Sequence, residues 1–156
     1  MGNPNPVRLD WGDEKAMQRF TGVFERQLDV KGRLALPATF RAHLGTICYL
    51  TLGSDSSIEV FTTQQFDDEA DRMQELERSG AISRDRLRAF SVRAQTAEPD
   101  AQGRIYLDER LRQHARLAVK GPAMVMGLLD RIEICSVDRY GRSMATGELQ
   151  YSESQS

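Results

Sequence analysis

Cysteine and long apolar runs are both scarce in this chain of 156 residues. Its two cysteines, Cys48 and Cys135, are too few for a disulfide scaffold and lack the close spacing of zinc ligands. No run approaches the roughly 18 apolar residues of a membrane-spanning helix, and Met1–Leu9 contains no apolar segment typical of a signal peptide. We therefore expect a cytoplasmic protein in reducing surroundings, without a metal site or a membrane partner.

The sequence also lacks the patterns that mark many enzymes. It contains neither a glycine-rich nucleotide-binding loop nor a Walker loop, and no Ser, His and Asp in the order of a hydrolase triad. The acidic run at 67–71 falls at the start of a predicted helix, where carboxylates are favourable, and we interpret it as structural. No catalytic residue and no cofactor are predicted.

Charge is unevenly distributed in this mildly acidic protein. The whole chain has a net charge of −2 and an isoelectric point of about 5.7, which by itself does not favour binding to nucleic acid. Residues 20–45 and 100–120 each have a net charge of +2, so the remainder of the chain has −6. Arginine supplies 18 of the 21 basic residues, and its planar guanidinium group suits phosphate and guanine. The two basic segments are therefore the candidates for contact with DNA.

The two basic segments are also copies of one another. The stretch DVKGRLAL at 29–36 reappears as DAQGRIYL at 100–107, an offset of 71 residues. The similarity resumes at an offset of 74, where residues 58–60 match residues 132–134. A repeat that carries its flanking apolar pattern predicts two copies of one structural unit, packed together around a shared β core.

Each copy is predicted to contain a strand, a tight turn, a short strand, a short helix and a hairpin. Glycine at 32 and 103 permits the positive φ that the turn requires. Pro37 suits the first position of a helix, and Asp108 is a good N-cap in the second copy. The predicted strands fall at 20–28, 33–36, 47–52, 57–61, 90–96, 104–107, 123–127 and 131–135.

Two helices are predicted between the copies, and little regular structure after them. The first runs from Gln64 to about Glu77, and the second runs from Arg84 to Phe90 behind the N-cap Ser83. Because glycine occurs at 141 and 147, the stretch from Arg142 onward is predicted to be weakly helical at best. The residues from 148 to the end are predicted to be disordered.

The repeated motif and its surroundings point to a known family. Phe20 and Gly22, followed by LDVKGRLALPATFR at 28–41, resemble the opening of the MraZ family of bacterial transcriptional regulators. The family's Asp-x-x-x-Arg motif occurs twice, at Asp29–Arg33 and Asp100–Arg104, and the resemblance covers about residues 20–140. Relative to the family pattern, residues 1–16 are extra, Asp108 replaces a usual proline, and Cys135 replaces a usual tryptophan.

This resemblance implies a mixed α+β fold, mainly β, with two tandem SpoVT/AbrB-type units. In such units swapped hairpins form one pseudo-symmetric β-barrel core with short flanking helices. The predicted organisation is a disordered N-terminal extension at 1–18, a first unit with its following helices at 19–88, a second unit at 89–150, and a polar tail at 151–156.

The resemblance further implies a sequence-specific, DNA-binding transcriptional regulator. It would bind direct repeats upstream of the division and cell-wall gene cluster, as a closed homo-oligomeric ring associated with the nucleoid. Two alternatives stay open: an AbrB-type protein-interaction module like those of antitoxins, and an enzyme. The short polar tail disfavours the antitoxin reading, and the missing catalytic patterns disfavour an enzyme.

Arg33 and Lys31 are the leading candidates for contact with double-stranded DNA, with Arg104 the weaker equivalent of Arg33 and Arg41 a further candidate. Arg33 could instead serve only as an ion-pair partner of Asp29 that closes the turn. Arg41 and its counterpart Arg112 could be solvated helix residues. Structural roles in the motif are assigned to Asp29, Gly32, Asp100 and Gly103.

Overall fold

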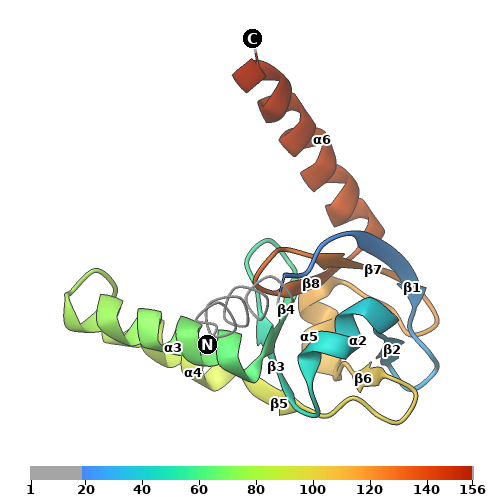
Figure 1. The fold of residues 1–156 in the computed structure, drawn as a ribbon, viewed down its shortest axis with the longest axis horizontal. Coiled ribbons are helices and arrows are strands. Elements are labelled where there is room, and N and C mark those ends of the chain that lie inside the picture. Colours follow the sequence, from blue (N-terminus) through green and yellow to red (C-terminus); the bar gives the residue numbers. More distant parts are fainter. Residues whose placement is uncertain (1–18, 156) are drawn as a thin grey trace, which may run out of the picture.

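The computed structural model describes residues 19–155, and the predicted N-terminal extension lies outside the described residues. The strands are β1 (Val23–Gln27), β2 (Arg33–Ala35), β3 (Cys48–Leu52), β4 (Ile58–Thr62), β5 (Gln95–Ala97), β6 (Arg104–Tyr106), β7 (Pro122–Gly127) and β8 (Ile132–Cys135). The helices are α2 (Ala38–Leu44), α3 (Thr63–Arg78), α4 (Arg84–Arg93), α5 (Glu109–Ala115) and α6 (Val137–Gln155) (Figure 1).

The two copies of the repeat exchange strands within one antiparallel sheet. The strand order is β1-β7-β8-β4-β3-β5, so β1 of the first copy pairs with β7 of the second, and β5 of the second pairs with β3 of the first. The two hairpins, β3–β4 and β7–β8, meet where β4 pairs with β8. A second sheet contains only β2 and β6, again one strand from each copy. These pairings join both copies in one core, as the repeat predicted.

The predicted closed barrel is not found in residues 19–155. The larger sheet ends at β1 and at β5, and β2 and β6 pair only with each other. A barrel needs a continuous ladder of hydrogen bonds around its circumference. Three of the strands, β2, β5 and β6, have only three residues each, which is too short to carry that ladder.

The core lies between the sheets and the short helices α2 and α5. Phe40 of α2 is buried between Phe20 and Phe24, and both ring pairs meet edge to face, with centroids 5.6 and 5.5 Å apart. Leu111 occupies the corresponding buried place on α5. The Asp108 carboxylate accepts a hydrogen bond from the backbone N–H of Leu111 and so caps the start of this helix. Asp108 is therefore the N-cap of the helix in the second copy, as the sequence predicted.

Both cysteines belong to this core. Cys48 and Cys135 are 0% and 1% exposed, and burial raises the pKa of each thiol to about 11. Because the thiolate is the reactive form, neither side chain is a reactive thiol in the folded protein.

The predicted strand at 90–96 is wrong in its first half. Helix α4 begins behind Ser83, whose hydroxyl accepts a hydrogen bond from the backbone N–H of Arg86, and continues to Arg93. Phe90 packs against Phe66 of α3, with stacked rings 5.6 Å apart, and this contact keeps the segment helical. The strand β5 starts only at Gln95.

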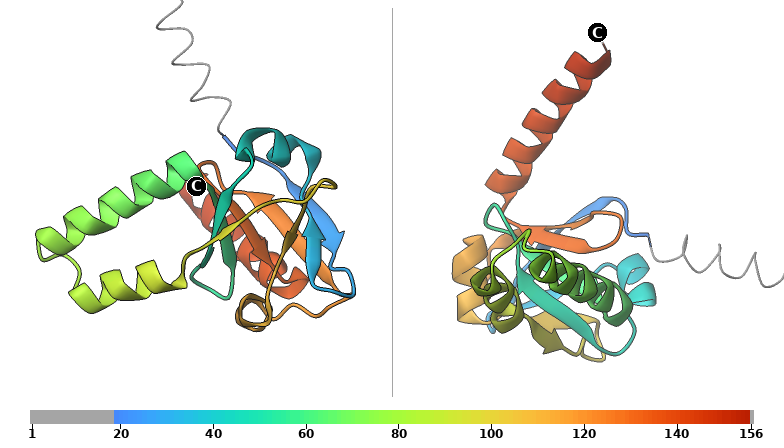
Figure 2. Two further views of the ribbon diagram at one scale, coloured as in Figure 1. Left: turned by 90° about the horizontal axis from the view of Figure 1, so that it is seen from below. Right: turned by 90° about the vertical axis from the view of Figure 1, so that its left-hand side faces the viewer.

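The C-terminal prediction is also wrong, because α6 is a continuous helix to Gln155. The Ser136 hydroxyl accepts a hydrogen bond from the N–H of Arg139 and so caps its first turn. This cap, with the helix-forming residues between the two glycines, outweighs the cost of about 1 kcal/mol for each glycine. Figure 1 and the right-hand view of Figure 2 show α6 projecting from the sheet. None of the helices in residues 19–155 is long and apolar enough to span a membrane.

Candidate nucleic-acid interface

The turn before β2 is organised by a single carboxylate. One oxygen of Asp29, Oδ1, accepts hydrogen bonds from the backbone N–H groups of Lys31 and Arg33, at 2.9 and 2.8 Å. The other, Oδ2, accepts from Nε of Arg33 at 2.7 Å. Gly32 adopts φ 85°, a conformation that glycine permits without steric cost. The carboxylate thus fixes both the turn and the direction of the Arg33 side chain.

The turn before β6 repeats this arrangement. Asp100 Oδ1 accepts from the N–H groups of Gln102 and Arg104, both at 2.9 Å, and its Oδ2 accepts from Arg104 Nε at 2.9 Å. Gly103 has φ 77°. The second turn therefore has the same ion pair and the same pattern of backbone hydrogen bonds as the first.

The strands that follow the two turns form a short two-stranded ribbon, β2–β6. Leu34 and Ile105 lie opposite each other and are fully buried, which anchors the ribbon to the core. Because side chains alternate along a strand, the flanking residues of each strand lie on the outer face. This face consists of Arg33, Ala35, Arg104 and Tyr106. Figure 1 places β2 and β6 at the end of the molecule opposite α6.

The ribbon is bordered by arginines that cross from one copy to the other. Arg112 of α5 lies over Gly32 and donates a hydrogen bond to the carbonyl of Leu107 at 2.9 Å. Arg41 of α2 lies over Gly103 in the same manner. A Cβ at either glycine would collide with the guanidinium group above it, so both glycines are required for this approach as well as for φ. Sequence reasoning did not propose Arg112 as a site residue, although its equivalence to Arg41 in the repeat is the signal that identifies it.

All four predicted DNA-contact residues come together here. Lys31 is exposed at the tip of the first turn, and Arg33 and Arg104 lie on the outer face with side chains 32% and 27% exposed. Arg41 borders the second turn and is also exposed. With Arg112, the ribbon and its border present five basic side chains against the carboxylates of Asp29 and Asp100.

The ion pair leaves most of the Arg33 guanidinium group available. Asp29 engages Nε, and within residues 19–155 neither terminal nitrogen of Arg33 donates a hydrogen bond. Those two nitrogens form the fork with which arginine contacts phosphate or the O6 and N7 atoms of guanine. Pairing with Asp29 and contact with DNA are therefore compatible, and the carboxylate can serve to orient the fork.

The hydrogen bonds to Asp29 make its carboxyl unusually acidic. The N–H of Arg33 is the largest influence, and together with the other donors it lowers the pKa of Asp29 from 3.8 to about 2. The pKa of Asp100 is lowered for the same reason, with the N–H of Arg104 the largest influence.

This shift predicts how the first turn responds to acid. A carboxyl whose pKa is lowered by folding contributes stability above its unfolded pKa, and the contribution disappears as the pH falls through the folded pKa. We expect the Asp29 carboxyl carbon, followed by NMR in a pH titration of the native protein, to titrate near pH 2. A midpoint near pH 4 in the folded state would show that the turn is not built on this carboxylate.

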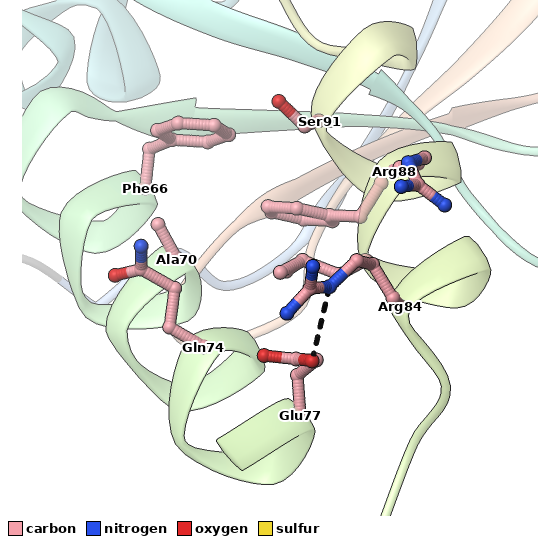
Figure 3. Close-up of a pocket in the computed structure, with 9 residues that line it drawn as sticks. Phe66, Ala70, Gln74, Glu77, Arg84, Arg88 and Ser91 are labelled. Atoms are coloured by element: carbon pink, nitrogen blue, oxygen red, sulfur yellow. Dashed lines mark ion pairs between the residues drawn. The ribbon is translucent and has the colours of Figure 1, made fainter.

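A separate cleft lies between α3 and α4, and no residue of the β2–β6 ribbon lines it. It has a volume of about 510 Å³, and its lining combines apolar side chains, among them Phe66, Ala70 and Leu87, with polar and charged ones. Figure 3 shows the Phe66 ring directed into the cleft and the ion pair between Arg84 and Glu77, at 3.5 Å, across its outer part. Within residues 19–155, no group of three metal-ligating side chains occurs here or elsewhere.

The fold and the ribbon define a class: a β-ribbon protein made of two intertwined repeats. A family model described as "MraZ protein, putative antitoxin-like" matches residues 19–89 and again residues 90–155. The chain therefore belongs to the MraZ family, which is a family of transcriptional regulators and not of enzymes.

Curated relatives agree with this assignment over most of the chain. The proteins of Alkaliphilus metalliredigens and Clavibacter michiganensis are each 34% identical over 134 residues, which cover 86% of this chain and 92% of theirs. The protein of Ligilactobacillus salivarius is 36% identical over 121 residues, 78% of this chain and 83% of its own. All three are named transcriptional regulator MraZ.

Proposed function

We propose that this protein is a sequence-specific transcriptional regulator that binds double-stranded DNA through the β2–β6 ribbon. Its targets would be direct repeats upstream of the division and cell-wall gene cluster, bound in the cytoplasm on the nucleoid. The observation that carries this proposal is the outward, partly exposed position of Arg33 and Arg104 on a ribbon bordered by further cations. The names of the relatives support the regulatory role.

The chemistry of the ribbon matches the major groove of DNA. The groove is wide enough for a two-stranded β-ribbon, and an arginine fork directed at base edges favours guanine. Lys31, Arg41 and Arg112 lie around the ribbon, where contacts to phosphates would hold its position. Asp29 and Asp100 would orient the two arginines without touching the DNA.

One ribbon carries too few cations for tight binding, because each phosphate contact adds only modest affinity. We therefore include a closed ring of identical subunits in the proposal, since a ring presents several ribbons to successive repeats and binds by avidity. Such a ring requires two different, complementary surfaces on each subunit.

The α3–α4 hairpin offers surfaces of opposite charge for this assembly. On α3 the exposed carboxylates of Asp67 and Asp71 have no ion-pair partner within residues 19–155. On α4 the exposed Arg86 and Arg93 likewise form no ion pair with any described residue. The hairpin extends away from the sheet (Figure 2), so α4 of one subunit could reach α3 of the next.

Reversing the charge of α4 is expected to reduce the assembly. In the double variant Arg86→Glu and Arg93→Glu, like charges would face each other across the subunit contact, so the mass measured by light scattering should fall below that of the wild type. Replacing Asp67 and Asp71 by lysine in the same chain should restore the mass of the wild-type assembly. Arg142→Glu on α6 is the matched control and should leave the mass unchanged. A wild-type protein that is a single protomer would refute the ring.

Selection of bound duplexes from random-sequence DNA tests the function itself. The full-length protein is expected to enrich short guanine-containing boxes in tandem, all in one orientation and at constant spacing. Failure to enrich any sequence above background, at a salt concentration where nonspecific binding is weak, would refute sequence-specific DNA binding.

A further inference from the structure

The two ends of the ribbon differ, although the repeat makes its backbone nearly symmetric. At one end, Arg33 lies opposite Tyr106, next to the turn that carries Lys31. At the other end, Arg104 lies opposite Ala35, next to the turn that carries Gln102. We call these the Lys31 end and the Gln102 end. Among the residues of the turns and strands, the Lys31 end therefore combines two cations with an aromatic ring, whereas the Gln102 end has one cation and no ring, and each end is bordered by one further arginine, Arg112 and Arg41 respectively.

Arg33 and Arg104 also differ in the number of carboxylates with which they form ion pairs. Nη1 of Arg104 lies 3.7 Å from Oδ2 of Asp29, so Arg104 is attracted by the carboxylates of both turns. Within the described residues Arg33 forms an ion pair with Asp29 alone. The fork of Arg33 is therefore the freer of the two, which makes the Lys31 end the stronger candidate for contact with bases.

Tyr106 is an unusual residue for the outer face of this ribbon. It is 55% exposed, and within residues 19–155 no side chain hydrogen-bonds to its hydroxyl or stacks on its ring. Its position directly opposite Arg33 places the two side chains roughly 5 Å apart at Cβ. Adjacent base pairs are about 3.4 Å apart, and two long side chains that start this close together can reach neighbouring bases.

We propose, on the basis of the DNA-binding function above, that the ribbon reads base pairs in one orientation only and that Tyr106 is a specificity-determining residue. Arg33 contacts a guanine, and the Tyr106 ring packs on the 5-methyl group of an adjacent thymine, the apolar group that the major groove offers. A symmetric ribbon would read a box equally well in both directions. The difference between its ends gives each box a direction, which direct repeats require.

Uracil substitution in the DNA isolates the proposed contact, because uracil lacks only the 5-methyl group of thymine. The probe is the tandem duplex enriched by the wild type, with uracil replacing the thymine next to the selected guanine in each box. Wild-type affinity should fall about fourfold per box, the value of one buried methyl group. Tyr106→Ala should bind thymine and uracil duplexes equally, and Tyr106→Phe should discriminate like the wild type. Tyr151→Ala, an exposed tyrosine on α6, is the matched control.

The possible results distinguish failure of the DNA-binding function from failure of the proposed role of Tyr106. If the wild type enriches no sequence, the DNA-binding function fails. If it enriches a box that is palindromic or lacks thymine beside the guanine, the function stands and the inference is overturned. Equal sensitivity to uracil in the wild type and in Tyr106→Ala would also overturn it, because the methyl contact would then not involve Tyr106.

Discussion

Replacing Arg33 by alanine is expected to lower affinity for the selected DNA repeats by roughly 10- to 100-fold for each box that a subunit contacts. The substitution removes the arginine fork that is freest to contact guanine. Folding should be little affected, because the ion pair with Asp29 is about one-third exposed and such exposed pairs contribute little to stability. The backbone N–H groups of Lys31 and residue 33 would still bind the Asp29 carboxylate.

A mobility-shift titration at several salt concentrations measures this loss. The slope of affinity against salt should fall only slightly, since one cation per subunit is removed, whereas discrimination against altered guanines should disappear. Arg142→Ala is the matched control, because Arg142 is an exposed arginine on α6, away from both the ribbon and the α3–α4 hairpin. Unchanged affinity and unchanged base preference in Arg33→Ala would remove Arg33 from the interface.

Replacing Leu34 by alanine is expected to have the largest effect on stability, lowering the free energy of unfolding by about 2–5 kcal/mol. Leu34 is fully buried and pairs with Ile105, so its loss leaves a cavity beneath the ribbon where the two copies meet. DNA binding should weaken as well, because the outer face would no longer be held rigidly.

Urea denaturation monitored by circular dichroism measures this change. The neighbouring exposed residue provides the control: Val30 is 63% exposed, and Val30→Ala should change stability by no more than about 0.5 kcal/mol. If Leu34→Ala were as stable as Val30→Ala, the ribbon would not be anchored by the core.

The sequence predicted the parts of the site that depend on local chemistry. An Asp-x-x-Gly-Arg stretch contains both the carboxylate that binds the turn and the glycine that allows it, so the geometry around Asp29 and Asp100 follows from neighbouring residues. The repeat then indicated that both turns would adopt one structure. Strands β3, β4, β7 and β8 were predicted to within one residue at each end, because each is a short, mainly apolar run and such a run is a local signal.

Contacts between distant parts of the chain could not be predicted in this way. The position of the Arg112 side chain over Gly32 depends on strand exchange between the copies, because this exchange brings α5 beside the first turn. The segment around Phe90 fits both a helix and a strand by its pattern, and only packing on Phe66 decides between them. In α6, the cap from Ser136 and the helix-forming residues between the two glycines together outweigh the cost of those glycines.

Site-directed DNA cleavage tests the central claim most directly. A cysteine introduced at the exposed position 30 can carry an iron chelate, while Cys48 and Cys135 stay unlabelled because they are buried. The labelled full-length protein should cut the selected DNA once within each box, at the same place in every repeat. A label at position 151, on α6, should leave the boxes uncut. Cutting from position 151 with none from position 30 would contradict binding through the β2–β6 ribbon.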